Sequence, residues 1–322
     1  MIGLYIGIDA GTSAIRLCVV DENRQTLDTE RQALDAPHVD GARVEQDPQI
    51  WWQALQDALG RILGRINRPQ LRRIAIDGTS GTLLLCDSHG TPLAPALMYN
   101  DTSTAARATG ITQLAPADAA VHGAASSLNK LLDLMGRTTG GAVALHQADW
   151  LSGMLLGSFG ISDENNALKL GYDARLRRWP NWISELELPH GMLPQVVPPG
   201  QVLGNIDSRL AAHWNLPAGV EIVAGTTDST AGFIAAGASE VGQAVTSLGS
   251  TLVVKVLSDR PVYVARHGVY SHRLGDAWLV GGASNAGGRL LRQFFSESEI
   301  ARHTARLQPD KPTGLDYYPL AG

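Results

Sequence analysis

The sequence predicts a mixed α/β fold with two related halves. Strand-like and helix-like patterns alternate in the N-terminal half, as is typical of layered α/β domains. In addition, the motif Asp9-Ala-Gly-Thr-Ser13 returns in part as Ser247-Leu-Gly-Ser-Thr251, with its glycine 238 positions further along the chain. Each copy is a short glycine-hydroxyl turn between two β-type runs. The repeat therefore indicates two hairpins of the same kind.

The N-terminal part of the chain shows the clearest elements. Asp47-Pro48 predicts a helix start, because Asp caps helices and Pro fits the first turn. Apolar residues then recur at helical spacing from Trp51 to Ile66. Apolar runs predict strands at Leu4–Ile8, Ile15–Asp21, Gln25–Ala33, Arg73–Asp77 and Thr82–Cys86, the first two joined as a hairpin.

The middle of the chain is less regular, and the pattern becomes clear again after Gly219. Helices are expected at Leu128–Met135 and Asp149–Leu156, whereas Pro180–Pro199 is expected to be irregular. After Gly219 we expect strands at Val220–Ala224, Gln243–Ser247, Leu252–Leu257, His267–Arg273 and Trp278–Gly281, and helices at Ser229–Ala238 and Arg289–Phe295.

Composition limits the classes of function. A chain of 322 residues with 44% hydrophobic content suggests about two domains. The net charge of −5 gives no electrostatic reason to expect nucleic acid or an anionic membrane as a partner. Cys18 and Cys86 each lie in an expected strand and resemble small buried hydrophobes rather than a disulfide pair. Without a signal peptide or an apolar membrane-spanning stretch, a cytoplasmic location is expected.

The two glycine-hydroxyl turns, Gly11-Thr12-Ser13 and Gly249-Ser250-Thr251, favour phosphate binding. A glycine beside Ser or Thr lets backbone N–H groups approach an anion without steric hindrance from a Cβ atom. Ordinary hairpins use the same residues, so one copy alone would be weak evidence. Two copies, each preceded by an apolar strand, favour binding of one polyphosphate.

Three polar residues stand out as candidates for chemistry. Asp9 follows a strand directly and could hold the water shell of Mg²⁺, although it could also close its own turn. Asp228 precedes an expected helix, where it could be a general base or simply a helix cap. Ser80 lies in a glycine-flanked strand break that could present hydroxyl and amide groups to a polyol, or be a plain tight turn or bulge. Metal-ligand spacing, a nucleophile elbow and a lysine-containing phosphate loop are all missing from the sequence.

The motifs, taken together, resemble those of the FGGY carbohydrate kinases, which are sugar kinase members of the actin-like ATPase superfamily. They occur in the family's order. The matching segments are Gly7–Ser13, Val44-Glu-Gln-Asp-Pro48 with Trp51-Trp52, Ile76-Asp-Gly-Thr-Ser-Gly81, Ala224-Gly-Thr-Thr-Asp-Ser229 and Ser247–Thr251. Likeness to the D-ribulokinase/xylulokinase-like branch comes from Asp77–Thr82, Asn166-Ala-Leu-Lys-Leu-Gly-Tyr172 and Gly314-Leu-Asp-Tyr-Tyr-Pro319.

The resemblance implies an RNase-H-like, two-domain sugar kinase fold and ATP-dependent phosphorylation of a small sugar, with ATP and Mg²⁺ bound. By this resemblance Asp228 is the general base and also lies beside the sugar, which Ser80 contacts. Asp9 is implied near the metal. The phosphate groups are implied at the two turns, Gly11-Thr12-Ser13 and Gly249-Ser250-Thr251. Phosphoryl transfer requires alignment and charge stabilisation more than covalent catalysis, which agrees with such a sparse set of groups.

Two departures from the family pattern affect these expectations. Family members carry Trp-x-Asp-x-Arg where this chain has Tyr99-Asn-Asp-Thr-Ser103, so an arginine near the implied sugar pocket is missing. This departure counts against xylulose or glycerol specificity and favours D-ribulose, within an expected substrate class of pentuloses such as D-ribulose or D-xylulose. Family members also continue beyond the point that corresponds to Gly322. We therefore expect a sugar- and phosphate-binding domain at 1–235, and at 236–322 a partial second domain without its adenosine loop. As a consequence, little or no kinase activity is expected, together with a homodimer or higher oligomer. The alternative is a catalytically impaired or truncated homologue that binds sugar or nucleotide.

Overall fold

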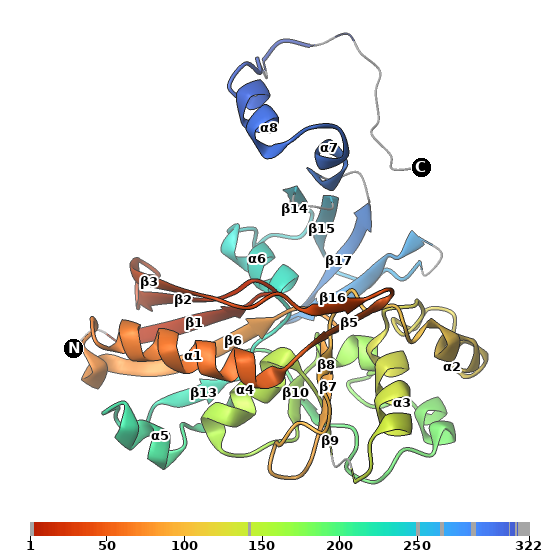
Figure 1. Cartoon of the computed structure of the whole chain (residues 1–322), viewed down its shortest axis with the longest axis horizontal. Helices are drawn as coiled ribbons and strands as arrows, with labels where there is room; N and C mark the ends of the chain where they lie inside the picture. Colours follow the sequence, from red (N-terminus) through yellow and green to blue (C-terminus); the bar gives the residue numbers. More distant parts are fainter. Residues whose placement is uncertain are drawn as a thin grey trace. The chain divides into compact units, whose positions relative to one another are not determined.

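The computed structural model describes residues 3–140, 143–248, 252–264, 267–284, 288–308, 310–312 and 314 (Figure 1). The chain forms two compact units. The first comprises Met1–Gly232 with His272–Gly275, and the second comprises Phe233–Ser271 with Asp276–Gly322. None of the helices described combines the length and apolar character that crossing a membrane requires.

A six-stranded sheet positions the candidate site in the first unit. The central strands β1 (Leu4–Ala10), β6 (Leu71–Gly78) and β13 (Glu221–Val223) are parallel, so their carboxyl ends meet at one edge of the sheet. The sheet order is β12-β13-β6-β1-β2-β3. Its other strands are β2 (Ala14–Asp21), β3 (Thr26–Ala33) and β12 (Val202–Asn205), each antiparallel to its neighbour.

Two helices cover one face of this sheet and form the larger core. Helix α1 (Pro48–Leu63) packs on β2 and β3, and α4 (Gln147–Leu156) packs on β6 and β13 (Figure 1). The two helices meet through Trp51 and Trp150, whose fully buried rings lie edge to face with centroids 6.3 Å apart. Aromatic pairs prefer such an arrangement over a face-to-face sandwich. The pair therefore fixes the helical layer behind the strand ends.

A second layer of the first unit supports the loop that follows β6. It contains a five-stranded sheet, of order β4-β5-β8-β7-β9, and α3 (Ser127–Arg137), which packs on β7. The strands are β4 (His38–Asp40), β5 (Arg43–Gln46), β7 (Leu83–Cys86), β8 (Ala96–Leu97) and β9 (Val143–His146), with a separate parallel pair β10 (Ile161–Asp163) and β11 (Gln195–Val197). Shorter helical segments are α2 (Ala108–Leu114), α5 (Ser208–His213), η1 (Arg68–Gln70), η2 (Ala105–Arg107), η3 (Ala167–Leu170) and η4 (Asn181–Leu186).

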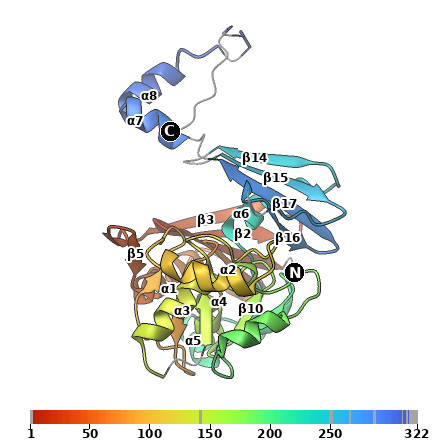
Figure 2. The same cartoon turned by 90° about the vertical axis from the view of Figure 1, so that its right-hand side faces the viewer.

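The second unit is built on one four-stranded sheet of order β14-β15-β17-β16 (Figure 2). Strands β14 (Ala244–Leu248) and β15 (Leu252–Ser258) pair antiparallel, as β1 and β2 do in the first unit. The segment that joins β14 to β15 contains the second glycine-hydroxyl turn, Gly249-Ser250-Thr251, which lies outside the described residues. The other elements are β16 (Tyr270–Leu274), β17 (Ala277–Ser284), α7 (Gly288–Phe294) and α8 (Glu297–Thr304). Helix α6 (Asp228–Ala235) begins in the first unit and ends in the second.

Most of the expected elements are present, with differences at their ends. Asp47 caps α1, its side chain accepting a hydrogen bond from Gln49 N, but the helix ends at Leu63 rather than near Ile66. The expected irregular segment Pro180–Pro199 contains η4 and β11, because short 3₁₀ turns and three-residue strands leave little periodic signal. Cys18 is only partly buried, whereas Cys86 is buried as expected, and both thiols are free.

Candidate active site

The candidate site begins with two carboxylates at the ends of adjacent parallel strands. Asp9 on β1 and Asp77 on β6 are direct register partners. Ile8 and Ile76, which precede them, are buried in the core, so the pleat of each strand directs the following aspartate to the opposite face. Both aspartates line an open cavity of ≈ 690 Å³ on this face of the sheet. Ligands of open α/β sheets bind outside the carboxyl ends of the strands, where these side chains lie.

Asp228 is brought to the same edge by the loop that follows β13. Thr227 forms an isolated parallel bridge with Gly78, the last residue of β6. Asp228 is the next residue; it is exposed and begins α6, where its Oδ1 accepts a hydrogen bond from Ser229 N at 2.6 Å. A carboxylate at a helix start is stabilised as the anion by the helix dipole. The helix-start and active-site roles of Asp228 are therefore compatible.

The three carboxylates influence one another electrostatically. Burial raises the pKa of Asp77 to about 8, and the negative charges of Asp9 and Asp228 add to the rise. Like charges at short range disfavour ionisation, so Asp77 is largely protonated at neutral pH. A strongly shifted pKa in a cavity is typical of functional sites, because such shifts require an environment that stability alone does not favour.

The first glycine-hydroxyl turn lies beside Asp9 and is partly closed on itself. Gly11 N donates to Ala14 O at 3.1 Å, so this amide is already engaged. Arg16 Nη1 donates to Asp9 Oδ2 at 2.8 Å, which forms a partly exposed ion pair. Thr12 is partly buried and Ser13 is exposed at the turn. An anion at this turn would therefore meet Thr12, Ser13 and the guanidinium of Arg16.

Ser80 lies in a loop that begins directly after β6 and is held by several side chains. Lys169 Nζ donates to Ser80 O at 3.1 Å, and Lys130 Nζ donates to the next carbonyl, that of Gly81, at 2.7 Å. Gly81 has φ of +95°, a conformation that favours glycine. The backbone of the loop is thus fixed, and the partly buried Ser80 side chain is presented next to the end of β6.

Two polar side chains of this region, those of Thr79 and Lys130, are unusual because they are buried. Thr79 Oγ1 donates to Gln147 Oε1 at 2.8 Å and contacts Thr82 Oγ1 at 2.6 Å. Lys130 is fully buried, and desolvation, with a smaller contribution from the charge of Lys169, lowers its pKa to about 7. Such groups are retained only where their hydrogen bonds offset the desolvation. Here they fix the loop that carries Ser80.

The sequence motifs indicate site roles for Asp9, Ser80 and Asp228. They indicate none for Asp77, Lys130 or Lys169. Asp77 carried a signal, since it ends a strand next to a turn as Asp9 does. The two lysines carried none, because their targets are backbone carbonyls distant in the sequence. Within the Tyr99–Ser103 segment, Asp101 is fully buried and accepts a hydrogen bond from Val44 N at 2.7 Å.

Solved structures of known proteins share this fold. The fold matches a xylulose kinase from Rhodospirillum rubrum with a TM-score of 0.82 over 94% of this chain and 66% of that chain, at 20% identity. It matches Plasmodium falciparum glycerol kinase with ADP with a TM-score of 0.81 over 95% of this chain and 67% of that chain, at 16% identity. The expected actin-like ATPase fold of sugar kinases is therefore confirmed.

Part of the sequence matches a family model. Residues 4–123 match the N-terminal domain of the FGGY family of carbohydrate kinases, which confirms the resemblance seen in the motifs. The chain is 25% identical to the xylulose kinase of Escherichia coli over 85% of its length, and 27% identical to that of Streptomyces coelicolor over 80%. It spans 59% of the length of the former and 55% of the latter.

Proposed function

We propose that this protein is an ATP-dependent kinase of a small sugar, with a pentulose such as D-xylulose or D-ribulose as substrate. The observation that carries the proposal is the convergence of Asp9, Asp77 and Asp228 at the carboxyl ends of parallel strands. Support for a sugar comes from the FGGY match, and support for a pentulose comes from the xylulose kinases among the relatives. The Tyr99–Ser103 departure favours D-ribulose of the two sugars.

In this proposal Asp228 is the general base. An exposed carboxylate at the start of α6 can accept a proton from a sugar hydroxyl as that oxygen attacks the terminal phosphate of ATP. Ser80, two residues beyond the bridge between Gly78 and Thr227, contacts the sugar. The turn Gly11-Thr12-Ser13 binds the phosphate groups, with the described geometry favouring Thr12 and Ser13 over the engaged amide of Gly11. Gly249-Ser250-Thr251 is proposed as the second phosphate turn on sequence grounds.

The carboxylates at the strand ends suit Mg²⁺. Mg²⁺ keeps several of its waters and takes one or two carboxylates, a demand that Asp9 with Asp77 can meet. The pKa of Asp77 is raised first by burial and then by the negative charges of Asp9 and Asp228, which a cation would offset. Across the described residues, the His, Cys, Asp and Glu side chains form no group of three or more that could hold a metal by itself. When bound with ATP, Mg²⁺ would offset the charge of the phosphate groups.

The test is a phosphotransfer assay on the full-length natural protein. Purified protein, MgATP and D-ribulose, D-xylulose, glycerol or an aldopentose are incubated, and ADP and sugar phosphate are measured. We expect a pentulose to be turned over at about 1–10³ s⁻¹, the usual enzyme range. Preference for glycerol or an aldose would refute the substrate class. Sugar binding without turnover of any sugar would favour the alternative of a sugar- or nucleotide-binding homologue.

The matched variant is Asp228→Asn, which keeps the shape of the side chain and removes its basicity. Loss of a general base typically reduces the rate about 10²–10⁴-fold. We expect that fall in kcat, with sugar affinity, measured by calorimetry, within about threefold of the wild type. Turnover within a few-fold of the wild type would show that Asp228 is only a helix-start residue.

A further inference from the structure

A buried polar turn, distinct from the groups assigned above, contacts the loop that carries Asp228. It comprises Asp163-Glu164-Asn165-Asn166, beginning at the last residue of β10, and each of the four residues is 2% exposed or less. Burying polar side chains costs free energy unless their groups are hydrogen-bonded, so a run of four requires a local reason. Their hydrogen bonds supply that reason.

Asp163 fixes the backbone of the turn. Its Oδ1 accepts hydrogen bonds from Asn165 N at 2.8 Å and Asn166 N at 3.1 Å, and its Oδ2 accepts from Asn166 Nδ2 at 2.6 Å. A short aspartate side chain that accepts from the two following amides is a common way to hold a turn. Asn165 is therefore presented in one orientation.

The side chain of Asn165 bridges two segments that are distant in sequence. Its Nδ2 donates to Thr226 Oγ1 at 3.0 Å and to Arg273 O at 3.0 Å, while its Oδ1 accepts from Arg273 N at 3.0 Å. Both amide protons and the amide oxygen thus have partners, which determines which way the amide group faces. Arg273 belongs to the part of β16 that lies within the first unit.

Thr226 is two residues before Asp228, and its neighbours are also constrained. Gly225 lies so close to β6 that a Cβ atom there would be 1.7 Å from Ile76 O. Thr227 bridges to Gly78, as described above. Within the loop the hydroxyl groups of Thr227 and Thr230 lie 3.0 Å apart, and Asn165 adds a hydrogen bond to Thr226 from a segment distant in sequence.

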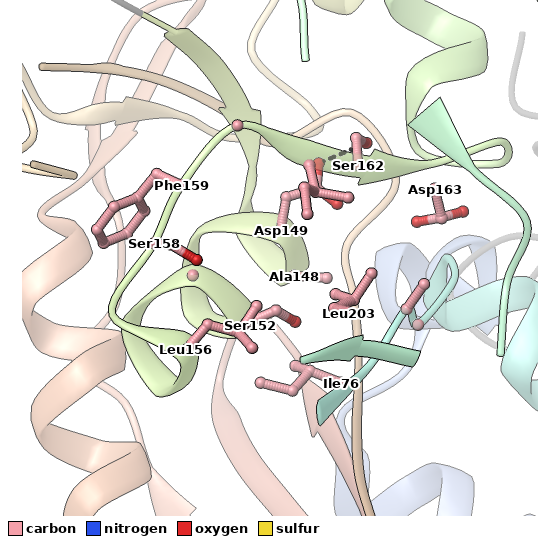
Figure 3. Close-up of a pocket in the computed structure, with 15 residues that line it drawn as sticks. Ile76, Ala148, Asp149, Ser152, Leu156, Ser158, Phe159, Ser162, Asp163 and Leu203 are labelled. Atoms are coloured by element: carbon pink, nitrogen blue, oxygen red, sulfur yellow. Dashed lines mark hydrogen bonds between the residues drawn. The ribbon is translucent and has the colours of Figure 1, made fainter. Parts of the chain in front are cut away.

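A small cavity lies beside the Asp228 loop where Gly225 faces the buried polar turn at Asp163. A cavity of ≈ 10 Å³, with room for about one water molecule, is lined by Asp163 and Gly225 together with Asp149 and Ser162 (Figure 3). The side chains of Asp149 and Ser162 hydrogen-bond to each other at 2.7 Å. Since a void provides no van der Waals contacts, the hydrogen bond from Asn165 adds a directional contact on this side of the loop.

From these contacts we infer that Asn165 is a positioning residue for Asp228, acting through Thr226. Only the expected effect on kcat rests on the proposed function; the structural role of Asn165 rests on its hydrogen bonds. A displacement of a reacting group by about 1 Å can reduce a rate about 10²-fold, even when the altered residue is remote from the chemistry. A change confined to Asn165 should therefore affect the chemical step more than sugar binding.

The kinetic test compares Asn165→Ala, Thr226→Val and the double variant in the full-length protein. We expect each single variant to reduce kcat about 10–10²-fold with KM for the sugar within about threefold. The double variant should be no slower than the slower single variant, because both changes remove the same hydrogen bond between Asn165 and Thr226. The control is Asn129→Ala, which also removes a fully buried asparagine but one that donates to Gly123 O. Additive losses, or an equal loss of kcat in the control, would overturn the inference.

Hydrogen exchange gives a readout that does not require turnover. The amides of Thr230 and Ala231 donate to Thr227 O at 2.9 Å and report on the start of α6. In Asn165→Ala we expect their exchange, and that of Arg273 N, to accelerate at least about tenfold, the equivalent of roughly 1.4 kcal/mol. Acceleration confined to residues 163–170 would overturn the inference. If the wild type phosphorylates no sugar, the proposed function fails, and hydrogen exchange still decides whether Asn165 positions the loop.

Discussion

Asp9 and Asp77 are side-by-side carboxylates on parallel strands, and this pairing gives the edge of the sheet its chemical character. Neighbouring like charges in a partly buried site are unfavourable unless one group is protonated or a cation is present. Arg16 pairs with Asp9 at 2.8 Å, whereas Asp77 responds with a pKa raised to about 8. The two carboxylates at the strand ends are thus the candidate cation site of the proposed function.

A first prediction follows from the pKa of Asp77. The ordinary pKa of 3.8 applies to the unfolded chain and about 8 to the folded one, so the folded state binds the extra proton between these values. The stabilising effect of that proton is complete below pH 3.8 and is lost as the pH rises through 8. Asp77→Asn, which cannot ionise, should therefore gain stability relative to the wild type as the pH rises from 5 to 8.

Thermal unfolding measured at several pH values checks this. One pKa unit corresponds to about 1.4 kcal/mol, or roughly 2–4 °C in Tm for a domain of this size class. We expect the Tm difference between Asp77→Asn and the wild type to change by at least about 2 °C across the interval. Asp21→Asn, on the β2–β3 turn, is the control. Parallel Tm curves for Asp77→Asn and the wild type would contradict the prediction.

A second prediction concerns the contact between Gly225 and β6. In Gly225→Ala the new methyl group would meet the main chain at Ile76, which cannot move without disturbing the sheet. Overpacking in a core costs about 1–3 kcal/mol and occasionally more. We expect urea unfolding to show a loss at the upper end of that range. Gly219→Ala is the matched control, because a Cβ atom there would have no neighbour within 4 Å; equal effects of the two variants would show that the loop does not pack as described.

A third prediction uses the buried lysine. The pKa of Lys130 falls from 10.5 to about 7 on folding, so between these values the unfolded chain binds more protons than the folded one. Stability from this group is present above pH 10.5 and is lost as the pH falls to 7. Lys130→Met removes the effect, so the wild type should gain Tm relative to this variant between pH 7 and 9.5. The exposed Lys311→Met serves as control; a constant difference between Lys130→Met and the wild type would refute the buried titration.

The residues that could be predicted from the sequence are those whose signals are local. Asp47 was recognised as a helix cap, because the cap, the following proline and the apolar spacing are all within one helix. Asp9 and Asp228 were recognised through short motifs. Asp77 is paired with Asp9 of the neighbouring strand, and Lys130 donates to the carbonyl oxygen of Gly81, 49 positions earlier in the chain. Local sequence therefore indicates the role of neither residue. Gly225 looked like an ordinary turn residue because only the tertiary contact with Ile76 explains it.

The last prediction separates the phosphate site from the sugar site. Under the proposed function, Asp9→Ala and Thr12→Val should each weaken binding of MgATP at least about tenfold, roughly 1.4 kcal/mol, because they remove the carboxylate proposed to face Mg²⁺ and a hydroxyl of the proposed phosphate turn. Sugar binding should stay within about threefold, since Ser80 is held by Lys130 and Lys169 rather than by the β1–β2 hairpin. Calorimetry with each ligand alone measures both affinities.

The control for this prediction is Asp21→Ala. Asp21 also supports a hairpin turn through hydrogen bonds from Asn23 N and Gln25 N, but it belongs to the turn between β2 and β3. Its replacement should lower Tm without selective loss of MgATP affinity. If Asp9→Ala and Thr12→Val reduce both affinities equally, and Asp21→Ala does the same, then the first turn only maintains the hairpin. A selective loss of MgATP binding in the first two variants would instead establish Asp9 and Thr12 as ligand-facing residues, because a general weakening of the sheet cannot distinguish one ligand from the other.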